Sequence, residues 1–331
     1  MNMSPISHRQ RLEVCVSGEK SDRPPVALWR HFPMDDQSPE RLAAATLNFQ
    51  QTYDFDFVKV TPASSYSVRD WGCQDAWRGN TEGTRDYAPG VVEHPEDWIR
   101  LTALNPARGS LGDMLRCLKI LKAGLPPDTP IIQTIFSPLS QAKNLVGKHN
   151  LAVHLRRYPD AVHAGLKTIM ETTQRFIAAA LELGVDGVFY AVQHAQYGLL
   201  SESEFAEFGR AYDLQTLEAA QAGWFSMVHL HGEQVMFDAV SDYPVQALNW
   251  HDRDAGPTLK EARQRYAGVL CGGLRREQSI VLGAPSDVIT EARDAIEATQ
   301  GERFILGTGC VTPIIAPHGN LRAARQSVVL E

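Results

Sequence analysis

Apolar runs of strand length alternate with segments of helix length along almost the whole chain. Glycine, proline and polar turn residues bound these runs, and the pattern predicts eight strands. The predicted strands span 26–29, 55–60, 129–135, 185–192, 224–231, 245–250, 269–274 and 304–307. Alternating strands and helices are typical of a parallel sheet, and eight such units in 331 residues predict a single-domain α/β fold, a (β/α)8 TIM barrel spanning 1–331.

Helix start signals support this alternation. Ser38 followed by Pro39 predicts a helix start, and Ser201 with Glu204 three residues later forms a capping-box pattern. The predicted helices span 7–17, 38–52, 111–123, 158–183, 201–221, 234–240, 258–266, 286–299 and 318–326. No Gly-x-Gly-x-x-Gly follows the first strand, which argues against a nucleotide-binding doubly wound sheet.

One segment departs from the alternation, a long irregular insertion at about 64–106. It carries Trp71, Trp77 and Trp98 with several glycines and few periodic apolar positions. Loops of this length are usually functional lids or binding segments. An ordinary surface insertion explains the composition equally well, so both interpretations stay open.

Composition and charge narrow the class of protein. The net charge of −7 leaves no basic stripe for phosphates and argues against a nucleic-acid binder. No apolar run reaches the length of a membrane span, and residues 1–13 lack the apolar core of a signal peptide, so we expect a cytoplasmic protein. The five cysteines are far apart and form no Cys-x-x-Cys pair, which argues against a disulfide framework or zinc finger.

Histidines gather where the predicted strands end. His229 and His231 are two positions apart in one strand, so they share a face, and Gly232 ends that strand. Barrel active sites lie at the carboxyl ends of the strands. The histidines at such ends are His31, His194, His229, His231 and His251. The pair at 229 and 231 indicates metal ligands or a proton-handling pair, and two hydrogen-bonded histidines packed near a barrel mouth remain the alternative.

Cys310 ends the eighth predicted strand, and in a closed barrel its side chain comes near the end of the strand that carries His229. A thiolate with two imidazoles makes a three-ligand zinc set and leaves the fourth position open for substrate. We therefore predict a zinc site of His229, His231 and Cys310. We expect the other four cysteines to be inert core residues.

Three motifs resemble the uroporphyrinogen decarboxylase superfamily in order and spacing. They are Arg23-Pro24-Pro25-Val26-x-x-Trp29-Arg30, Phe136-Ser137-Pro138-Leu139, and a C-terminal motif from Phe304 through Gly309-Cys310 and Ala316-Pro317 to Asn320-Leu321. The similarity covers nearly the whole chain. It implies the barrel fold and an active site at the barrel mouth.

The chain departs from the true decarboxylase at its substrate-binding positions. Of the two arginines in that enzyme's N-terminal motif, only Arg30 is kept, and His31 with the residues after it replaces the remainder. Thr61-Pro62 stands where the decarboxylase has its essential Asp. The C-terminal Gly-His is Gly309-Cys310 here. We therefore do not expect decarboxylation of uroporphyrinogen.

The cobamide-dependent methyltransferase branch of the superfamily resembles the chain at Cys310. That branch binds zinc through a His-x-Cys pair and a later Cys, and this chain has His229-Leu230-His231 in place of the pair. A donor set with fewer thiolates carries less negative charge, so its zinc should be the stronger Lewis acid. The resemblance implies methyl transfer between a small substrate and a corrinoid partner or a thiol or oxygen acceptor. The corrinoid would sit on a separate protein, because no Asp-x-His-x-x-Gly segment is present.

Other residues at the strand ends are candidates for substrate contacts. Arg30 is expected to clamp a substrate carboxylate, His194 to handle a proton, and His251 to orient a ligand. Gln193 and Arg275 are further substrate-binding candidates. A lyase acting on a small carboxylate, with or without a metal, is the alternative function, and a non-catalytic binding barrel is a third. The resemblance also leaves a homodimer open.

Overall fold

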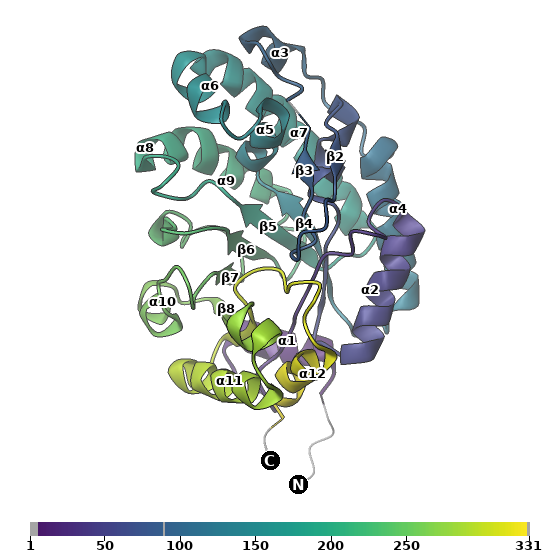
Figure 1. The fold of residues 1–331 in the computed structure, drawn as a ribbon, viewed down its shortest axis with the longest axis vertical. Coiled ribbons are helices and arrows are strands. Elements are labelled where there is room, and N and C mark those ends of the chain that lie inside the picture. Colours follow the sequence, from purple (N-terminus) through teal and green to yellow (C-terminus); the bar gives the residue numbers. More distant parts are fainter. Residues whose placement is uncertain (1–5, 89, 330–331) are drawn as a thin grey trace.

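The computed structural model describes residues 6–88 and 90–329, and these form one curled parallel sheet with helices packed outside it (Figure 1). Residues 1–5, part of the segment expected to lack a signal peptide, lie outside the described range. The seven strands pair in the order β1-β4-β5-β6-β7-β8-β9, all parallel. They are β1 (Val58–Val60), β4 (Ile131–Phe136), β5 (Gly187–Val192), β6 (Met227–Leu230), β7 (Ala247–Trp250), β8 (Val269–Leu274) and β9 (Phe304–Thr308). Every residue of these seven strands is buried, as in a sheet covered on both faces.

The helices follow the predicted alternation closely. Those expected from the sequence are α1 (His8–Ser17), α2 (Pro39–Tyr53), α4 (Gly109–Gly124), α7 (Pro159–Glu182), α10 (Leu259–Arg265), α11 (Pro285–Thr299) and α12 (His318–Gln326). The helix expected at 201–221 is divided by a π-helical turn into α8 (Glu202–Phe205), η3 (Ala206–Arg210) and α9 (Ala211–Glu218). The helix expected at 234–240 is only a 3-10 turn, η4 (Phe237–Ala239).

Three short helices and one π-helical turn lie where none was predicted. They are α3 (Pro95–Arg100), α5 (Pro138–Val146), α6 (Leu151–Arg157) and η5 (Gln278–Leu282). α5 begins at Ser137, whose hydroxyl accepts a hydrogen bond from the Ser140 N–H, with Pro138 at the first helical position. Among the described residues, no helix combines the length and the hydropathy that crossing a bilayer requires.

The structure corrects the prediction of a first strand at 26–29. The segment is extended but makes only one bridge, from Val26 to Leu306 of β9. On its other side, the Val26 carbonyl accepts a hydrogen bond from the Asp56 N–H (2.9 Å), just before β1. Pro24 and Pro25 have no N–H to donate, so the ladder cannot extend toward the N-terminus. The sheet therefore has seven strands, and this segment lies between its two edges.

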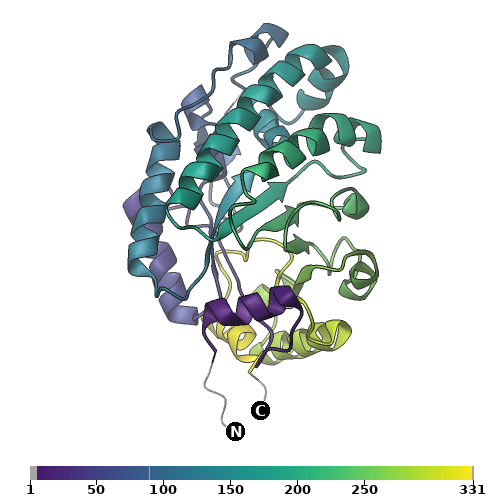
Figure 2. The same cartoon turned by 180° about the vertical axis from the view of Figure 1, so that it is seen from behind.

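Helix α1 covers the amino ends of the strands, on the face opposite the predicted site (Figure 2). The Arg9 N–H donates to the Asp128 carbonyl just before β4 (2.9 Å). The Arg11 guanidinium pairs with the fully buried Asp56 carboxylate (2.7 Å). The amino ends of the strands are thus closed by protein, and the carboxyl ends are left for ligands.

The insertion at 64–106 packs over the carboxyl ends of the strands. It contains η1 (Ser64–Ser67), η2 (Arg69–Trp71), the antiparallel pair β2 (Asp75–Ala76) and β3 (Asp86–Tyr87), and α3. The connection between β2 and β3 is tied to two other loops. The Thr81 carbonyl accepts from the Ile314 N–H (2.8 Å), and Glu82 pairs with Arg276 (2.6 Å).

Candidate metal centre

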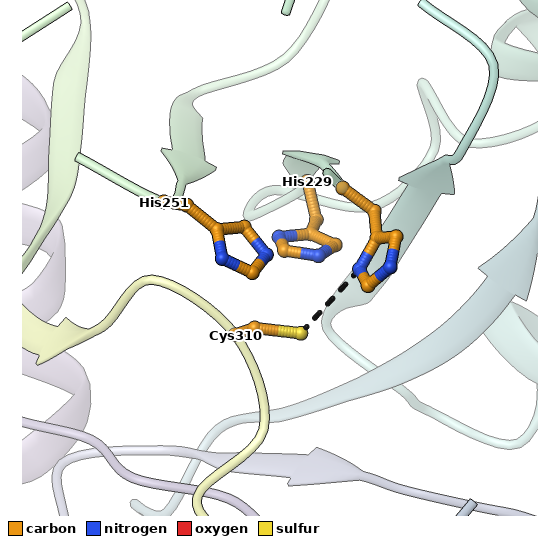
Figure 3. A group of neighbouring side chains, drawn as sticks. His229, His251 and Cys310 are labelled. Atoms are coloured by element: carbon orange, nitrogen blue, oxygen red, sulfur yellow. Dashed lines mark hydrogen bonds between the residues drawn. The ribbon is translucent and has the colours of Figure 1, made fainter. Parts of the chain in front are cut away.

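Four side chains with metal-binding atoms converge at the carboxyl ends of β6, β7 and β9. They are His229, His231, His251 and Cys310, and one donor atom from each lies within 4.8 Å of the others. Figure 3 shows the rings of His229 and His251 and the sulfur of Cys310 directed toward one region. The Cys310 sulfur lies 3.7 Å from Nδ1 of His231. The three residues of the predicted zinc set are therefore brought together, and His251 joins them.

Strand register explains why the histidines meet. His229 in β6 is the direct partner of Asn249 in β7. Because side chains alternate with a period of two, His231 and His251 follow on the same face, beyond His229 and Asn249. The ring centres of His231 and His251 are 5.4 Å apart.

Gly309 allows Cys310 to approach this cluster. A Cβ at position 309 would lie 2.7 Å from the Cα of His251 and 2.7 Å from the carbonyl oxygen of Trp250. Both contacts are with backbone, which cannot move aside without distorting β7. Glycine at 309 therefore brings the end of β9 against the end of β7, and the next side chain is the Cys310 thiol.

Asn249 fixes the orientation of the His229 ring. Its amide Nδ2 donates to the carbonyls of Cys271 (2.9 Å) and Thr308 (3.0 Å), so its Oδ1 faces His229. That oxygen lies 2.7 Å from Nδ1 of His229 and can only accept, which places the proton on Nδ1. The lone pair of Nε2 is then free for a metal, as in a ligand oriented by its hydrogen-bond partner.

We expect Asn249→Leu to weaken zinc binding by about 10- to 100-fold, the usual effect of losing such an orienting partner. The substitution also leaves two buried carbonyls and one ring N–H without partners, which should lower the free energy of unfolding by about 1–3 kcal/mol. Competition with a chromogenic chelator measures the first effect, and urea unfolding the second. Unchanged zinc affinity in a folded variant would remove Asn249 from this role.

The Cys310 thiol differs electrostatically from the other cysteines. Burial raises its pKa, but the charge of His229 and hydrogen bonds with the neighbouring imidazoles outweigh this and lower the pKa well below its usual value. Burial instead raises the pKa of Cys15 and Cys117 to about 12 and that of Cys73 to about 11, and it also raises that of Cys271. Since the thiolate is the form that binds metals, Cys310 is the cysteine prepared to do so.

The cluster fits zinc in its donor chemistry. Burial is the largest influence on His229 and lowers its pKa, which favours the neutral ring that a metal ligand requires. Nε2 of His251 is buried and makes no hydrogen bond with any residue that the structure describes. One thiolate and two or three imidazole nitrogens make a common zinc donor set, and three protein ligands leave a position for substrate.

A cavity of about 250 Å³ lies against the cluster. Its walls include the apolar rings of Trp29, Phe136 and Phe189 as well as polar groups. Gln193, a predicted substrate contact, lies in this wall and also lines a second cavity of about 440 Å³. Both cavities also share Lys143 and His231. The centre is thus reached by space sized for small molecules.

The family model described as Uroporphyrinogen decarboxylase (URO-D) matches residues 7–329. The chain belongs to the uroporphyrinogen decarboxylase family. The resemblance read from the three sequence motifs is thereby confirmed.

Several proteins that are similar to this chain are methyltransferases. Two proteins named Methylcobamide:CoM methyltransferase MtaA, from Methanosarcina barkeri and its strain Fusaro, are each 22% identical to this chain, with 97% of both chains covered. The structure of a methyltransferase from Methanosarcina mazei matches with a TM-score of 0.84 at 19% identity, covering 97% of this chain and 98% of its own. A B12-independent methionine synthase from Shewanella sp. W3-18-1 matches with a TM-score of 0.61 at 12% identity, covering 92% of each. At these identities the two structures show a shared fold.

Arg30 and Arg275, which were predicted to contact substrate, lie outside the lining of both cavities. Arg30 donates to the Ile314 carbonyl (3.2 Å), and its guanidinium lies over the rings of Phe32 and Phe49. Arg275 pairs with Glu291 (2.5 Å). Neither side chain is among the residues that line the two cavities, so the lyase hypothesis loses the carboxylate clamp on which it rested.

His194 lies in the wall of the second cavity and is buried. Burial first, and then the charge of Lys143, lower its pKa to about 3. Its ring is therefore neutral and a weak base, which does not favour the proton-handling role predicted for it.

Several cavity residues were not predicted. Lys59 of β1 and the insertion residues Glu82, Arg85 and Tyr87 all line the cavity of about 250 Å³ against the cluster. Lys59 had a signal in the sequence, since it is a charged residue inside the apolar run 55–60. The insertion residues had none, because their position depends on how a loop folds back over the sheet.

Proposed function

We propose that this protein is a zinc-dependent methyltransferase that moves a methyl group between a small substrate and a corrinoid carried by a partner protein. The observation that carries the proposal is the convergence of three imidazoles on the low-pKa thiol of Cys310. The names of the relatives support the reaction class. His229, His231 and Cys310 would hold the metal.

Zinc bound there would act as a Lewis acid that lowers the pKa of a substrate thiol or hydroxyl. Residues of the chain would orient the metal ligands and accept the proton. Asn249 holds the ring of His229, and Nε2 of His251, which has no other partner, is placed to accept the proton that the substrate loses. The rings of Trp29 and Phe189 exclude water from one side of the cavity.

We also propose that the segment 26–29 takes the place of the eighth strand in a (β/α)8 barrel. Its bridge to Leu306 and its hydrogen bond to Asp56 connect the two edges of the sheet. The corrinoid partner would then approach the open mouth, where both cavities lie.

The test is methyl transfer from methylcobalamin to 2-mercaptoethanesulfonate and to a panel of other small thiols and alcohols. Loss of the cobalt–methyl absorption reports turnover. We expect turnover that disappears after chelation and returns with added zinc. Turnover of no acceptor by the zinc-loaded enzyme would contradict the proposal, as would full activity after metal removal.

Uroporphyrinogen III should not be a substrate. The chain lacks the second N-terminal arginine and has Thr61 where the decarboxylase has its Asp. The cluster cavity of about 250 Å³ is also below the usual range of about 300–1,000 Å³ for drug-sized ligands, and a tetrapyrrole is larger than those. Formation of coproporphyrinogen in an anaerobic assay would overturn this expectation.

A further inference from the structure

Lys59 is a buried cation without a carboxylate partner among the described residues. It is 7% exposed, lies in β1, and lines the cavity next to the metal cluster. Its Nζ donates to Oγ1 of Thr61 at 3.3 Å, a weak contact with a neutral group. Burial lowers the pKa of the Lys59 amine to about 7. A bound anion would stabilise the charged ammonium, so a buried amine that faces a cavity without a carboxylate partner fits an anion site.

The carboxylates at this cavity are paired with other residues, and the negative charge that acts on Lys59 is the Cys310 thiolate. Arg85 is paired with Asp36 (2.5 Å), and Glu82 is paired with Arg276 (2.6 Å). Lys143 of α5 lines the same cavity, and within the described ranges it too has no acidic partner. The cavity therefore presents two ammonium groups whose charge is not balanced by protein carboxylates.

Lys59 is separated from the metal cluster by a single aromatic ring. Its Nζ lies 4.6 Å from the ring centre of Phe189, and that ring stacks on His229 with 5.3 Å between centres. Trp29 lies beyond, with its ring centre 6.0 Å from Nζ. A ligand lying along the edge of Phe189 can thus reach Lys59 with one end and the cluster with the other.

We propose that Lys59 binds the anionic group of a small organic acid, a carboxylate or a sulfonate, whose sulfur or oxygen atom reacts at the metal centre. The position of the reacting atom rests on the proposed function, whereas the anion site does not. Lys143 adds positive charge to the same cavity. A cavity of about 250 Å³ accommodates a molecule of this kind.

A structural role for Lys59 predicts something different. If its amine served only as a counter-charge for the Cys310 thiolate, its removal would change metal affinity and would weaken acids and neutral ligands equally. Discrimination between an acid and its neutral analogue therefore separates the two roles.

The experiment is calorimetric titration of the purified protein with 3-mercaptopropionate, 2-mercaptoethanesulfonate and the neutral 3-mercapto-1-propanol. We expect at least one of the acids to bind about 10- to 100-fold more tightly than the alcohol, the range expected for a hydrogen bond to a charged group. Lys59→Met should abolish this preference and leave the affinity of the alcohol unchanged. Lys167→Met, which removes an exposed lysine on α7, should change neither. The acid that shows the preference identifies the anion.

Controls keep this test separate from the test of methyl transfer. Propionate and propanesulfonate, which have no thiol, are titrated into chelator-treated protein, where a dependence on Lys59 should persist. Lys59→Gln repeats the measurement if the methionine variant unfolds. If wild-type protein prefers neither acid, or if the variants keep the preference, the anion site is wrong. If the preference depends on Lys59 but no methyl transfer occurs, the anion site stands and the proposed function fails.

Discussion

Replacing Cys310 by serine is expected to lower zinc affinity by at least about 100-fold and to abolish zinc-dependent methyl transfer. Loss of an orienting partner alone costs about 10- to 100-fold, and loss of a ligand should cost more. Cys310 supplies the one negative charge of the predicted donor set, and a serine hydroxyl stays protonated and neutral at working pH. Zinc content after dialysis and the methylcobalamin assay measure the two effects.

Cys15→Ser is the matched control. Cys15 is also buried, and its thiol donates to the carbonyl of Phe304 at the opposite end of β9 from Cys310. A hydroxyl can make the same contact, and burial raises the pKa of Cys15 to about 12, so it is not a ligand thiolate. Full zinc content and activity in Cys310→Ser would refute the metal site. His231→Cys, which recreates the His-x-Cys pattern of the methyltransferase branch, should keep zinc.

Asp56→Asn is expected to lower the free energy of unfolding by about 3–5 kcal/mol, the cost of removing one partner from a buried ion pair. The Asp56 carboxylate is fully buried and accepts from Arg11 and Arg23 (2.7 Å each) and from the Val26 N–H (2.8 Å). Asparagine leaves both guanidinium groups without their shared charge. It also removes the charged acceptor of the Val26 N–H and so weakens the attachment of segment 26–29 to the sheet.

Asp54→Asn is the control for this effect, because its side chain is 62% exposed and pairs with Arg325 and with Nε2 of His8 at the surface. Such a pair contributes about 0–1 kcal/mol. Chemical denaturation of the three proteins at pH 7 compares them. A loss below about 1 kcal/mol for Asp56→Asn would contradict the buried network.

The same carboxylate predicts how stability depends on pH. Burial raises the pKa of Asp56, but hydrogen bonds from His8 and Arg23 and the charge of Arg23 outweigh it, and the pKa lies below that of the unfolded chain. The contribution is therefore complete above the unfolded pKa of about 3.9 and is lost as the pH falls through the folded pKa. In Asp56→Asn the unfolding free energy should fall less steeply below about pH 4 than in the wild type.

The order of elements and the core of the site could be predicted from the sequence because both follow from local periodicity. His229 and His231 share a face for the same reason that strands alternate, and Cys310 ends the last strand. His251 was expected only to orient a ligand. Its convergence on the same donors depends on the register between β6 and β7, which one sequence does not specify.

What the sequence could not show depends on partners that are distant in the chain. Arg30 and Arg275 follow strands as substrate-binding arginines do, and in the structure Arg30 lies over Phe49 and Arg275 pairs with Glu291. Lys59 was absent from the prediction because a strand lysine was read as part of an apolar run. The strand at 26–29 was overestimated, because this extended segment makes a single bridge, from Val26 to Leu306.

X-ray absorption spectroscopy at the zinc edge, on protein purified without added metal, tests the central claim most directly. The account predicts about one zinc per chain, with one sulfur ligand at about 2.3 Å and nitrogen ligands at about 2.0–2.1 Å. The sulfur should be missing from zinc-soaked Cys310→Ser. A wild-type protein without stoichiometric metal, or a zinc shell that contains no sulfur, would contradict the assignment of His229, His231 and Cys310.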